Sequence, residues 1–212
     1  MLMKRILNSL ASRRAPGPLP SFSIFDILRF LRLLAETGCI GRGKISEKLD
    51  LGEGSVRTML KRLTEAGLVT KSRSGCLLTC EGKILWSKIE KAIPKLAEIE
   101  ANELTMAPYS VAVLVRGQAK IVGNGLEQRD IAVMNGAKGA VTIVAKNDKL
   151  IIPSVSGDLG RDYPLAFKRI MQLMKPKDED VIIISSANSL REAEYGALAA
   201  ALSLVNNFDN EK

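Results

Sequence analysis

The stretch Gly52-Glu-Gly-Ser-Val-Arg-Thr-Met-Leu-Lys-Arg-Leu-Thr-Glu-Ala-Gly67 decides the fold of the N-terminal part of this chain. Its apolar residues recur every three or four positions: Val56, Met59, Leu60 and Leu63. This spacing predicts an amphipathic helix over residues 55–66, ended by Gly67. Arg, Lys and Thr occupy the opposite face, and a helix with such a face fits the major groove of DNA. The alternative is that these residues only solvate an exposed helix.

The elements around this helix predict a winged helix-turn-helix. Helical spacing covers residues 21–38 and 44–49, and a Gly-containing turn leads into the helix at 55–66. Residues 68–79 are typical of two short strands around the tip Ser72-Arg-Ser-Gly75, and a further helix is expected over 81–102.

This region resembles the winged-helix domain of prokaryotic transcription regulators. The segments that carry the resemblance are Gly41-Arg-Gly-Lys-Ile-Ser-Glu-Lys-Leu49, Gly52 to Leu63, Glu65-Ala-Gly-Leu-Val69 and Leu78-Thr-Cys-Glu-Gly82. The whole chain also resembles an archaeal family of unassigned function, through Gly125-Leu-Glu-Gln-Arg-Asp-Ile-Ala132 and Gly136-Ala-Lys-Gly-Ala140. The resemblance implies a DNA-binding regulator and supplies no established ligand.

We therefore expect double-stranded DNA as a partner, contacted by the 55–66 helix, by the segment before it and by the tip of the wing. The candidate DNA-contacting residues are Arg42, Lys44, Gly54, Ser55, Arg57, Thr58, Lys61, Arg62 and Arg73.

The charge distribution agrees with a nucleic-acid module in the first half. Residues 1–103 hold 18 of the 31 Lys and Arg and 11 of the 23 Asp and Glu, so nearly all of the net charge of +8 lies there.

The apolar share of 46% is ordinary for a globular chain, and no apolar run reaches the length of a membrane span. Three cysteines, an odd number, indicate reduced thiols and a cytoplasmic location.

The complete absence of histidine excludes Ser-His and Cys-His nucleophile pairs and zinc sites that need His. We expect no enzyme activity, no metal and no cofactor. Two alternatives stay open: a winged helix fused to a metabolite enzyme such as a kinase, and a winged helix that contacts proteins. The kinase alternative lacks a Gly-rich loop with Lys and Ser to bind phosphate.

The chain is expected to divide into an arm and linker at 1–20, a winged helix at 21–80, a linker helix at 81–104 and a C-terminal domain at 105–212. The arm ends in the Pro/Gly-rich run 15–20, and we expect it to be frayed or docked on a partner.

The linker helix carries a seam for a partner helix, formed by Leu85, Ile89, Ala92, Leu96 and Ile99. This seam predicts a homodimer. Packing within the chain is the alternative, and Pro94 should kink the helix.

The C-terminal half predicts a small α/β sandwich with a mixed sheet, so the fold class is α+β with two domains. Strands are expected at 109–115, 140–145, 150–152 and 181–184, and helices at 126–135, 163–174 and 189–205.

Two polar segments of this half are candidates for binding a small anionic effector. The turn at 185–189 follows a buried strand and opens a helix, where backbone N–H groups favour anions. The segment 124–130 is dense in charged groups. The alternatives are helix capping by Ser189 and an acidic first turn that suits the helix dipole. The candidate ligand-binding residues are Arg116, Asn124, Glu127, Arg129, Asp130, Ser185, Ser186 and Asn188.

Overall fold

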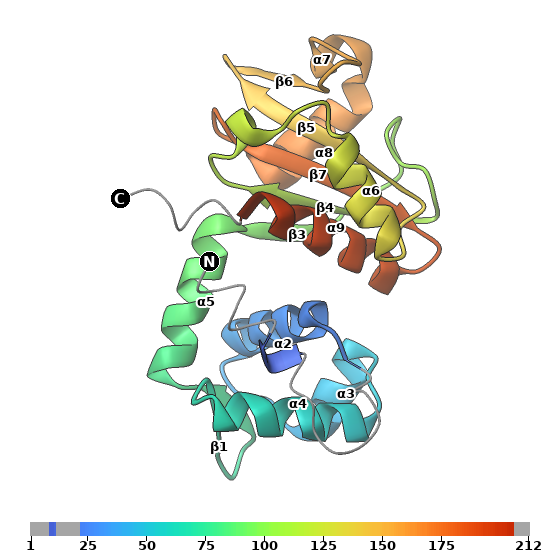
Figure 1. Cartoon of the computed structure of the whole chain (residues 1–212). Coiled ribbons are helices and arrows are strands. Elements are labelled where there is room, and N and C mark those ends of the chain that lie inside the picture. Colours follow the sequence, from blue (N-terminus) through green and yellow to red (C-terminus); the bar gives the residue numbers. More distant parts are fainter. Residues whose placement is uncertain (1–8, 12–21, 206–212) are drawn as a thin grey trace. The chain divides into compact units, whose positions relative to one another are not determined.

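A computed structural model describes residues 9–11 and 22–205 of the chain (Figure 1). The chain forms two compact units, residues 1–89 and residues 90–212, and each is described by itself. This division comes earlier than the expected boundary at 104/105, because residues 95–98 pair with the sheet of the second unit. Most of the expected N-terminal arm lies outside the described residues. Within it, Leu10 is buried.

The first unit has the element order of a winged helix-turn-helix, as predicted. Its elements are α2 (Ile24–Thr37), α3 (Arg42–Leu49), α4 (Glu53–Glu65), β1 (Val69–Lys71), β2 (Cys76–Leu78) and α5 (Cys80–Ala92). Ser23 and Asp26 form a capping box that starts α2. The side chain of each residue accepts a hydrogen bond from the backbone N–H of the other. The apolar faces of α2 and α4 are fully buried and form the core of this unit.

A backbone bridge joins the wing to the segment between α2 and α3. Ile40 and Cys76 exchange hydrogen bonds of 3.1 and 2.9 Å between their backbone N–H and C=O groups. Gly75 lies directly before this bridge with φ +144°, and a Cβ there would sit 2.4 Å from the carbonyl oxygen of Ile40. Only glycine fits this close approach.

The expected linker helix is shorter than predicted, and its seam is not a continuous helix face. Helix α5 ends at Ala92, and Pro94 is followed by strand β3 (Lys95–Glu98), so Leu96 lies on a strand. A proline cannot donate a helical hydrogen bond, and its ring clashes with the preceding turn. The seam residues are also buried within the chain. The prediction of a helix over 81–104 was therefore wrong beyond Ala92.

The second unit is built on a five-stranded sheet in the order β3-β4-β7-β5-β6. The strands after β3 are β4 (Tyr109–Val115), β5 (Gly139–Lys146), β6 (Lys149–Ile151) and β7 (Val181–Ala187). Every pairing is antiparallel, so the expected mixed sheet is corrected. Asn147 and Asp148 join β5 to β6 with φ of 51° and 59°, the conformation that a two-residue hairpin turn requires.

Helices cover both faces of this sheet (Figure 1). Helices α6 (Leu126–Met134) and α9 (Leu190–Val205) pack on one face, and the short α7 (Leu159–Asp162) and α8 (Pro164–Met174) pack on the other. A one-turn 3-10 helix, η1, spans Ala119–Ile121. Because β7 is buried on both faces, its side chains form an unbroken buried run, which usually indicates a parallel sheet. This explains why the sequence favoured a mixed sheet over a purely antiparallel one.

Within the described residues, no helix is long and apolar enough to cross a membrane.

Candidate nucleic-acid interface

The outward face of α4 carries most of the predicted DNA-contacting residues. Gly54, Arg57 and Lys61 are exposed, and Ser55 and Thr58 are half-buried. Lys61 is 75% exposed and forms a loose ion pair of 3.9 Å with Glu65 on the same helix. Exposed pairs of this kind contribute little to stability, so the ammonium group stays available to a phosphate.

The first turn of α4 presents backbone donors rather than a side-chain cap. Gly52 is the N-cap residue, and it has no side chain that could cap the N–H groups following it. Thr58 donates its hydroxyl hydrogen to the carbonyl oxygen of Gly54 at 2.9 Å, which fixes its methyl and hydroxyl groups on the helix surface. Backbone N–H groups at a helix N-terminus favour an anion such as a phosphate.

Arg62 does not lie on this face, which corrects the prediction for this residue. It is 6% exposed, and its Nη1 donates to the carbonyl oxygens of Leu10 at 2.8 Å and Ala11 at 3.0 Å. Its guanidinium also lies 5.3 Å from the ring centroid of Phe22. Position 62 borders the apolar face of α4, so the side chain turns inward and binds the backbone of the N-terminal segment. Arg62 is therefore a structural residue.

The wing and the start of α3 add further cations. Arg73 is exposed at the tip, where Ser72 N–H donates to the Gly75 carbonyl at 2.7 Å and closes the turn. Arg42 and Lys44 are exposed on α3. Lys71 on β1 is exposed as well, a cation that was not among the predicted contact residues.

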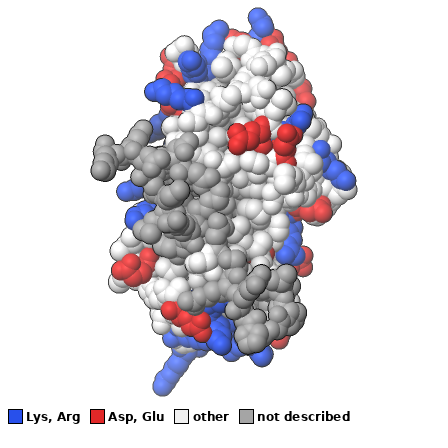
Figure 2. Space-filling view, in the orientation of Figure 1, with Lys and Arg blue, Asp and Glu red and all other residues white. Residues whose placement is uncertain are grey.

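Arg42 and Lys71 share one electrostatic neighbourhood with Cys76 on β2. Burial raises the pKa of the Cys76 thiol, while the positive charges of Lys71 and Arg42 oppose that rise. The Ile40–Cys76 bridge explains this proximity, because it places the start of α3 beside the wing. Lys and Arg side chains gather at the lower edge of Figure 2, where Figure 1 draws α4 and the wing.

The predicted effector site at the end of β7 is not an open turn. Ser185 and Ser186 belong to strand β7 and are buried, and the Ser186 and Ser110 hydroxyls lie 2.8 Å apart. Ser186 Oγ also accepts the N–H of Met106 at 3.1 Å. Only Asn188 is exposed. Ser189 Oγ accepts the N–H of Glu192 at 3.3 Å, so the capping alternative is confirmed.

Arg116 lies at the other end of the same strand pair and cannot join that group. Val115 pairs with Val181, whereas Ser185 pairs with Val111 further along the ladder. The guanidinium of Arg116 forms an ion pair with the buried Asp180, whose carboxylate also accepts the N–H groups of Gly117 and Lys177. Arg116 thus links the segment after β4 to the segment before β7.

The polar segment before α6 is a surface helix start. Asn124 Oδ1 accepts the N–H of Leu126 at 3.1 Å, and Glu127 is exposed. Arg129 and Asp130 pair with each other at 2.9 Å on the exposed face. Among the described residues, no group of three or more potential metal ligands comes together. The eight candidate ligand residues therefore do not form one site.

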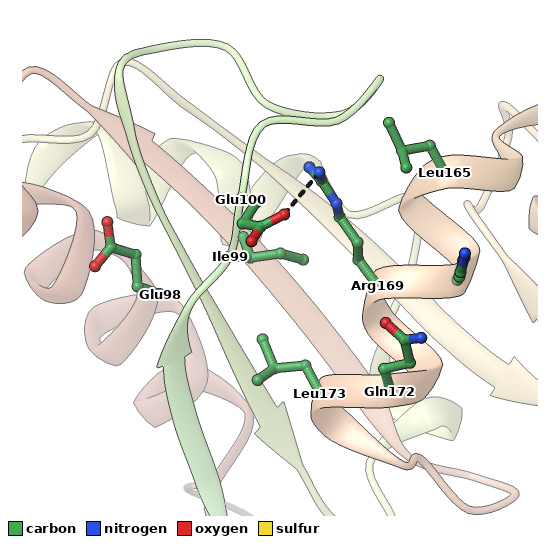
Figure 3. A pocket seen from close by; sticks show the side chains of 8 residues that line it. Glu98, Ile99, Glu100, Leu165, Arg169, Gln172 and Leu173 are labelled. Carbon is green, nitrogen blue, oxygen red and sulfur yellow. Dashed lines mark ion pairs between the residues drawn. The ribbon is translucent and has the colours of Figure 1, made fainter.

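The second unit has a groove that the sequence did not predict (Figure 3). It has a volume of about 510 Å³ and lies between the end of β3 and helix α8. Its lining residues are Glu98, Ile99, Glu100, Leu165, Lys168, Arg169, Gln172 and Leu173. The two walls come from segments far apart in sequence, and β3 itself was not expected, so no local pattern could reveal the groove.

Comparison with known proteins divides the chain in a similar way. Residues 23–84 match the model described as the PH0730-like, N-terminal domain, and residues 106–204 match the domain of unknown function DUF4443. The hypothetical protein PH0730 from Pyrococcus horikoshii OT3 is similar over 88% of this chain and 95% of its own, with 27% identity and a TM-score of 0.72. No curated protein matches the chain.

Two further solved structures match less of the chain. The hypothetical protein SSo2273 from Sulfolobus solfataricus matches over 32% of this chain and 54% of its own, with 26% identity and a TM-score of 0.28. A MarR family protein from Mycobacterium tuberculosis, Rv2887, matches over 42% of this chain and 63% of its own, with 19% identity and a TM-score of 0.30. The chain thus resembles the PH0730-like N-terminal domain and DUF4443 in two successive segments, and its fold is similar along nearly its whole length to that of the archaeal protein PH0730.

Proposed function

We propose that this protein is a DNA-binding transcription regulator that places α4 in the major groove. The observation that carries the proposal is the exposed face of α4, where Gly54, Arg57 and Lys61 lie opposite a fully buried apolar face. A major groove admits one helix, and cationic side chains on that helix reach phosphates and base edges.

The positions of the side chains suggest separate tasks. Arg57 and Thr58 lie one turn into α4 and are suited to base edges, as Arg is to guanine and the Thr methyl to thymine. Lys61 lies further along and suits a phosphate. Arg42, Lys44 and Arg73 flank the helix and would bind the backbone on either side.

The second unit would then serve assembly or regulation. Operators read by such domains are commonly two-fold, so we propose a homodimer that reads two half-sites. The seam on α5 no longer argues for it, because the helix ends at Ala92. We propose a binding role for this unit and no catalysis, because the chain contains no His to act as a general base near neutral pH.

The test measures binding of the full chain to a labelled random-sequence duplex across a salt series. Phosphate neutralisation releases counterions, so log affinity should fall linearly with log salt concentration. Lys61→Ala should weaken binding to all sequences and reduce the slope by about one unit. The matched control is Lys138→Ala, an exposed lysine of the second unit, which should leave both quantities unchanged.

Selection of preferred sequences from a randomised pool tests the base-reading role. Arg57→Ala should relax the preference at one position, at a cost of about 1–3 kcal/mol. If the full chain binds no duplex even at low salt, the proposal is wrong, and a winged helix that contacts proteins replaces it.

A further inference from the structure

The groove between β3 and α8 combines apolar walls with one incompletely paired guanidinium. Ile99, Leu165 and Leu173 provide the apolar surface, and Figure 3 shows Arg169 reaching from α8 toward Glu100. A volume of about 510 Å³ falls in the range of small-molecule sites, which are mostly apolar with a few placed polar groups.

Arg169 uses only part of its hydrogen-bonding capacity. Its Nη2 lies 2.7 Å from Oε2 of Glu100. Its Nη1 is buried and has no hydrogen-bond partner among the described residues. A guanidinium carries two parallel donors that match the two oxygens of one carboxylate, and a buried donor without an acceptor costs free energy. The arrangement is therefore half of a bidentate pair.

Glu100 is poorly placed to complete that pair. Its side chain is 83% exposed, whereas that of Arg169 is 24% exposed. An ion pair with one freely solvated partner is weak, and its carboxylate can move into water at little cost. Glu100 thus pairs with the guanidinium of Arg169 in a way that a ligand carboxylate can displace.

We propose that this groove binds a small monocarboxylate with a compact apolar body. The carboxylate of the ligand takes the place of Glu100 and accepts from both Nη1 and Nη2 of Arg169. The apolar body lies against Leu165 and Leu173, and burial of Leu165, which is 42% exposed, adds to the affinity.

The charges around the groove define the ligand class further. Once Glu100 is displaced into water, Lys168 and Arg169 face only Glu98 among the charged lining residues, so a singly charged ligand neutralises the groove, while a phosphate dianion leaves it net negative. Binding of this ligand is independent of the proposed function. Only its use as an effector rests on the DNA-binding proposal.

The test titrates hexanoate into the full chain, without DNA, by isothermal calorimetry. Hexanamide and inorganic phosphate are the matched probes, because one lacks the charge and the other lacks the apolar body. We expect hexanoate to bind, and the other two to bind at least about tenfold more weakly, since a charge-assisted bidentate pair is the main source of affinity.

Three variants assign the site. Glu100→Gln removes the internal competitor and should tighten hexanoate binding several-fold. Arg169→Gln should weaken it by about tenfold or more. Arg161→Gln, a change at an exposed arginine of α7 outside the groove, should leave it unchanged. Should Arg169→Gln fail to fold, Glu100→Gln still tests the proposal, because hexanoate should bind more tightly once the carboxylate that occupies Arg169 is removed.

The proposal is overturned if hexanoate gives no heat with either the native chain or Glu100→Gln. It is equally overturned if phosphate or hexanamide binds as well as hexanoate, or if Glu100→Gln does not tighten binding. A chain that binds hexanoate but no DNA would overturn the regulator proposal and leave the groove assignment in place.

Discussion

Arg62 of α4 donates a hydrogen bond of 2.8 Å to the backbone carbonyl of Leu10, which precedes it by 52 residues. The same Nη1 donates to the Ala11 carbonyl at 3.0 Å, and Phe22 covers the guanidinium. One cation of α4 therefore holds residues 10 and 11 on the first unit, while Arg57 and Lys61 of the same helix are exposed.

Replacement of Arg62 by Ala should destabilise the first unit by about 2–4 kcal/mol. The change removes charge-assisted hydrogen bonds, leaves two carbonyl groups without their donor and opens a space beside Phe22. Urea unfolding of the full chain, followed by Trp86 fluorescence, measures the effect.

The matched control is Arg57→Ala, which removes an exposed arginine from the same helix. It should change stability by no more than about 0.5 kcal/mol. Equal stability losses for the two variants would contradict the structural role of Arg62.

Replacement of Gly196 by Ala should destabilise the second unit. A Cβ at this position of α9 would lie 2.5 Å from Ser185 Oγ and 2.8 Å from the Cβ of Ala137. Such overpacking costs about 1–3 kcal/mol, more than the roughly 1 kcal/mol that Ala contributes in a helix relative to Gly.

Gly43→Ala on α3 is the control, because a Cβ there meets no atom within 4 Å. Thermal unfolding should show a higher midpoint for Gly43→Ala and a lower one for Gly196→Ala. Adding Ser185→Ala to Gly196→Ala should restore part of the loss. A Gly196→Ala variant as stable as the native chain would show that α9 does not pack this closely.

Glu103 should make the stability of the second unit depend on pH. Its side chain accepts the N–H groups of Leu165 at 3.0 Å and Ala166 at 2.8 Å, at the start of α8. Partial desolvation raises the pKa of this carboxyl, but the backbone hydrogen bonds and Arg169 outweigh it, so the pKa is lowered. The stabilisation is therefore complete above the ordinary pKa near 4.5 and is lost as the pH falls through the lowered value.

Glu103→Ala should cost about 1 kcal/mol at neutral pH, as for other lost helix caps, and should flatten the acid limb of the stability curve. Melting temperatures between neutral pH and pH values below 4.5 measure both effects. An acid limb as steep in the variant as in the native chain would assign the pH dependence to other carboxylates. Asp162 is the first to examine, because its hydrogen bonds with Arg161 and Ser156 lower its pKa to about 2.

Most of the fold could be predicted from the sequence because its determinants are local. The buried face of α4 follows from Val56, Met59 and Leu63, and the wing from the Gly-containing tip between two apolar runs. Strand β3 was not predicted, because four residues after Pro94 carry too short a pattern to separate from the preceding helix.

The candidate sites were harder to predict because they depend on contacts between distant segments. The inward turn of Arg62 depends on Leu10, and the groove depends on Glu100 meeting Arg169. Ser185 and Ser186 had the composition of a turn, yet packing of α9 on the sheet keeps them in β7. The sequence shows which residues are available to these sites, but not which of them come into contact.

Light scattering should show two copies of the chain on one operator duplex. A single helix in the major groove reads only a few base pairs, and two-fold related readers contact half-sites about 34–36 Å apart, one turn of DNA. The chain alone should be a dimer at micromolar concentration if the second unit holds the copies together. If instead the DNA duplex holds the two copies together, the chain alone should be a monomer and should pair only on DNA. A complex with one chain per duplex at saturating protein would contradict the homodimer. In that case the second unit would have no part in the spacing of half-sites.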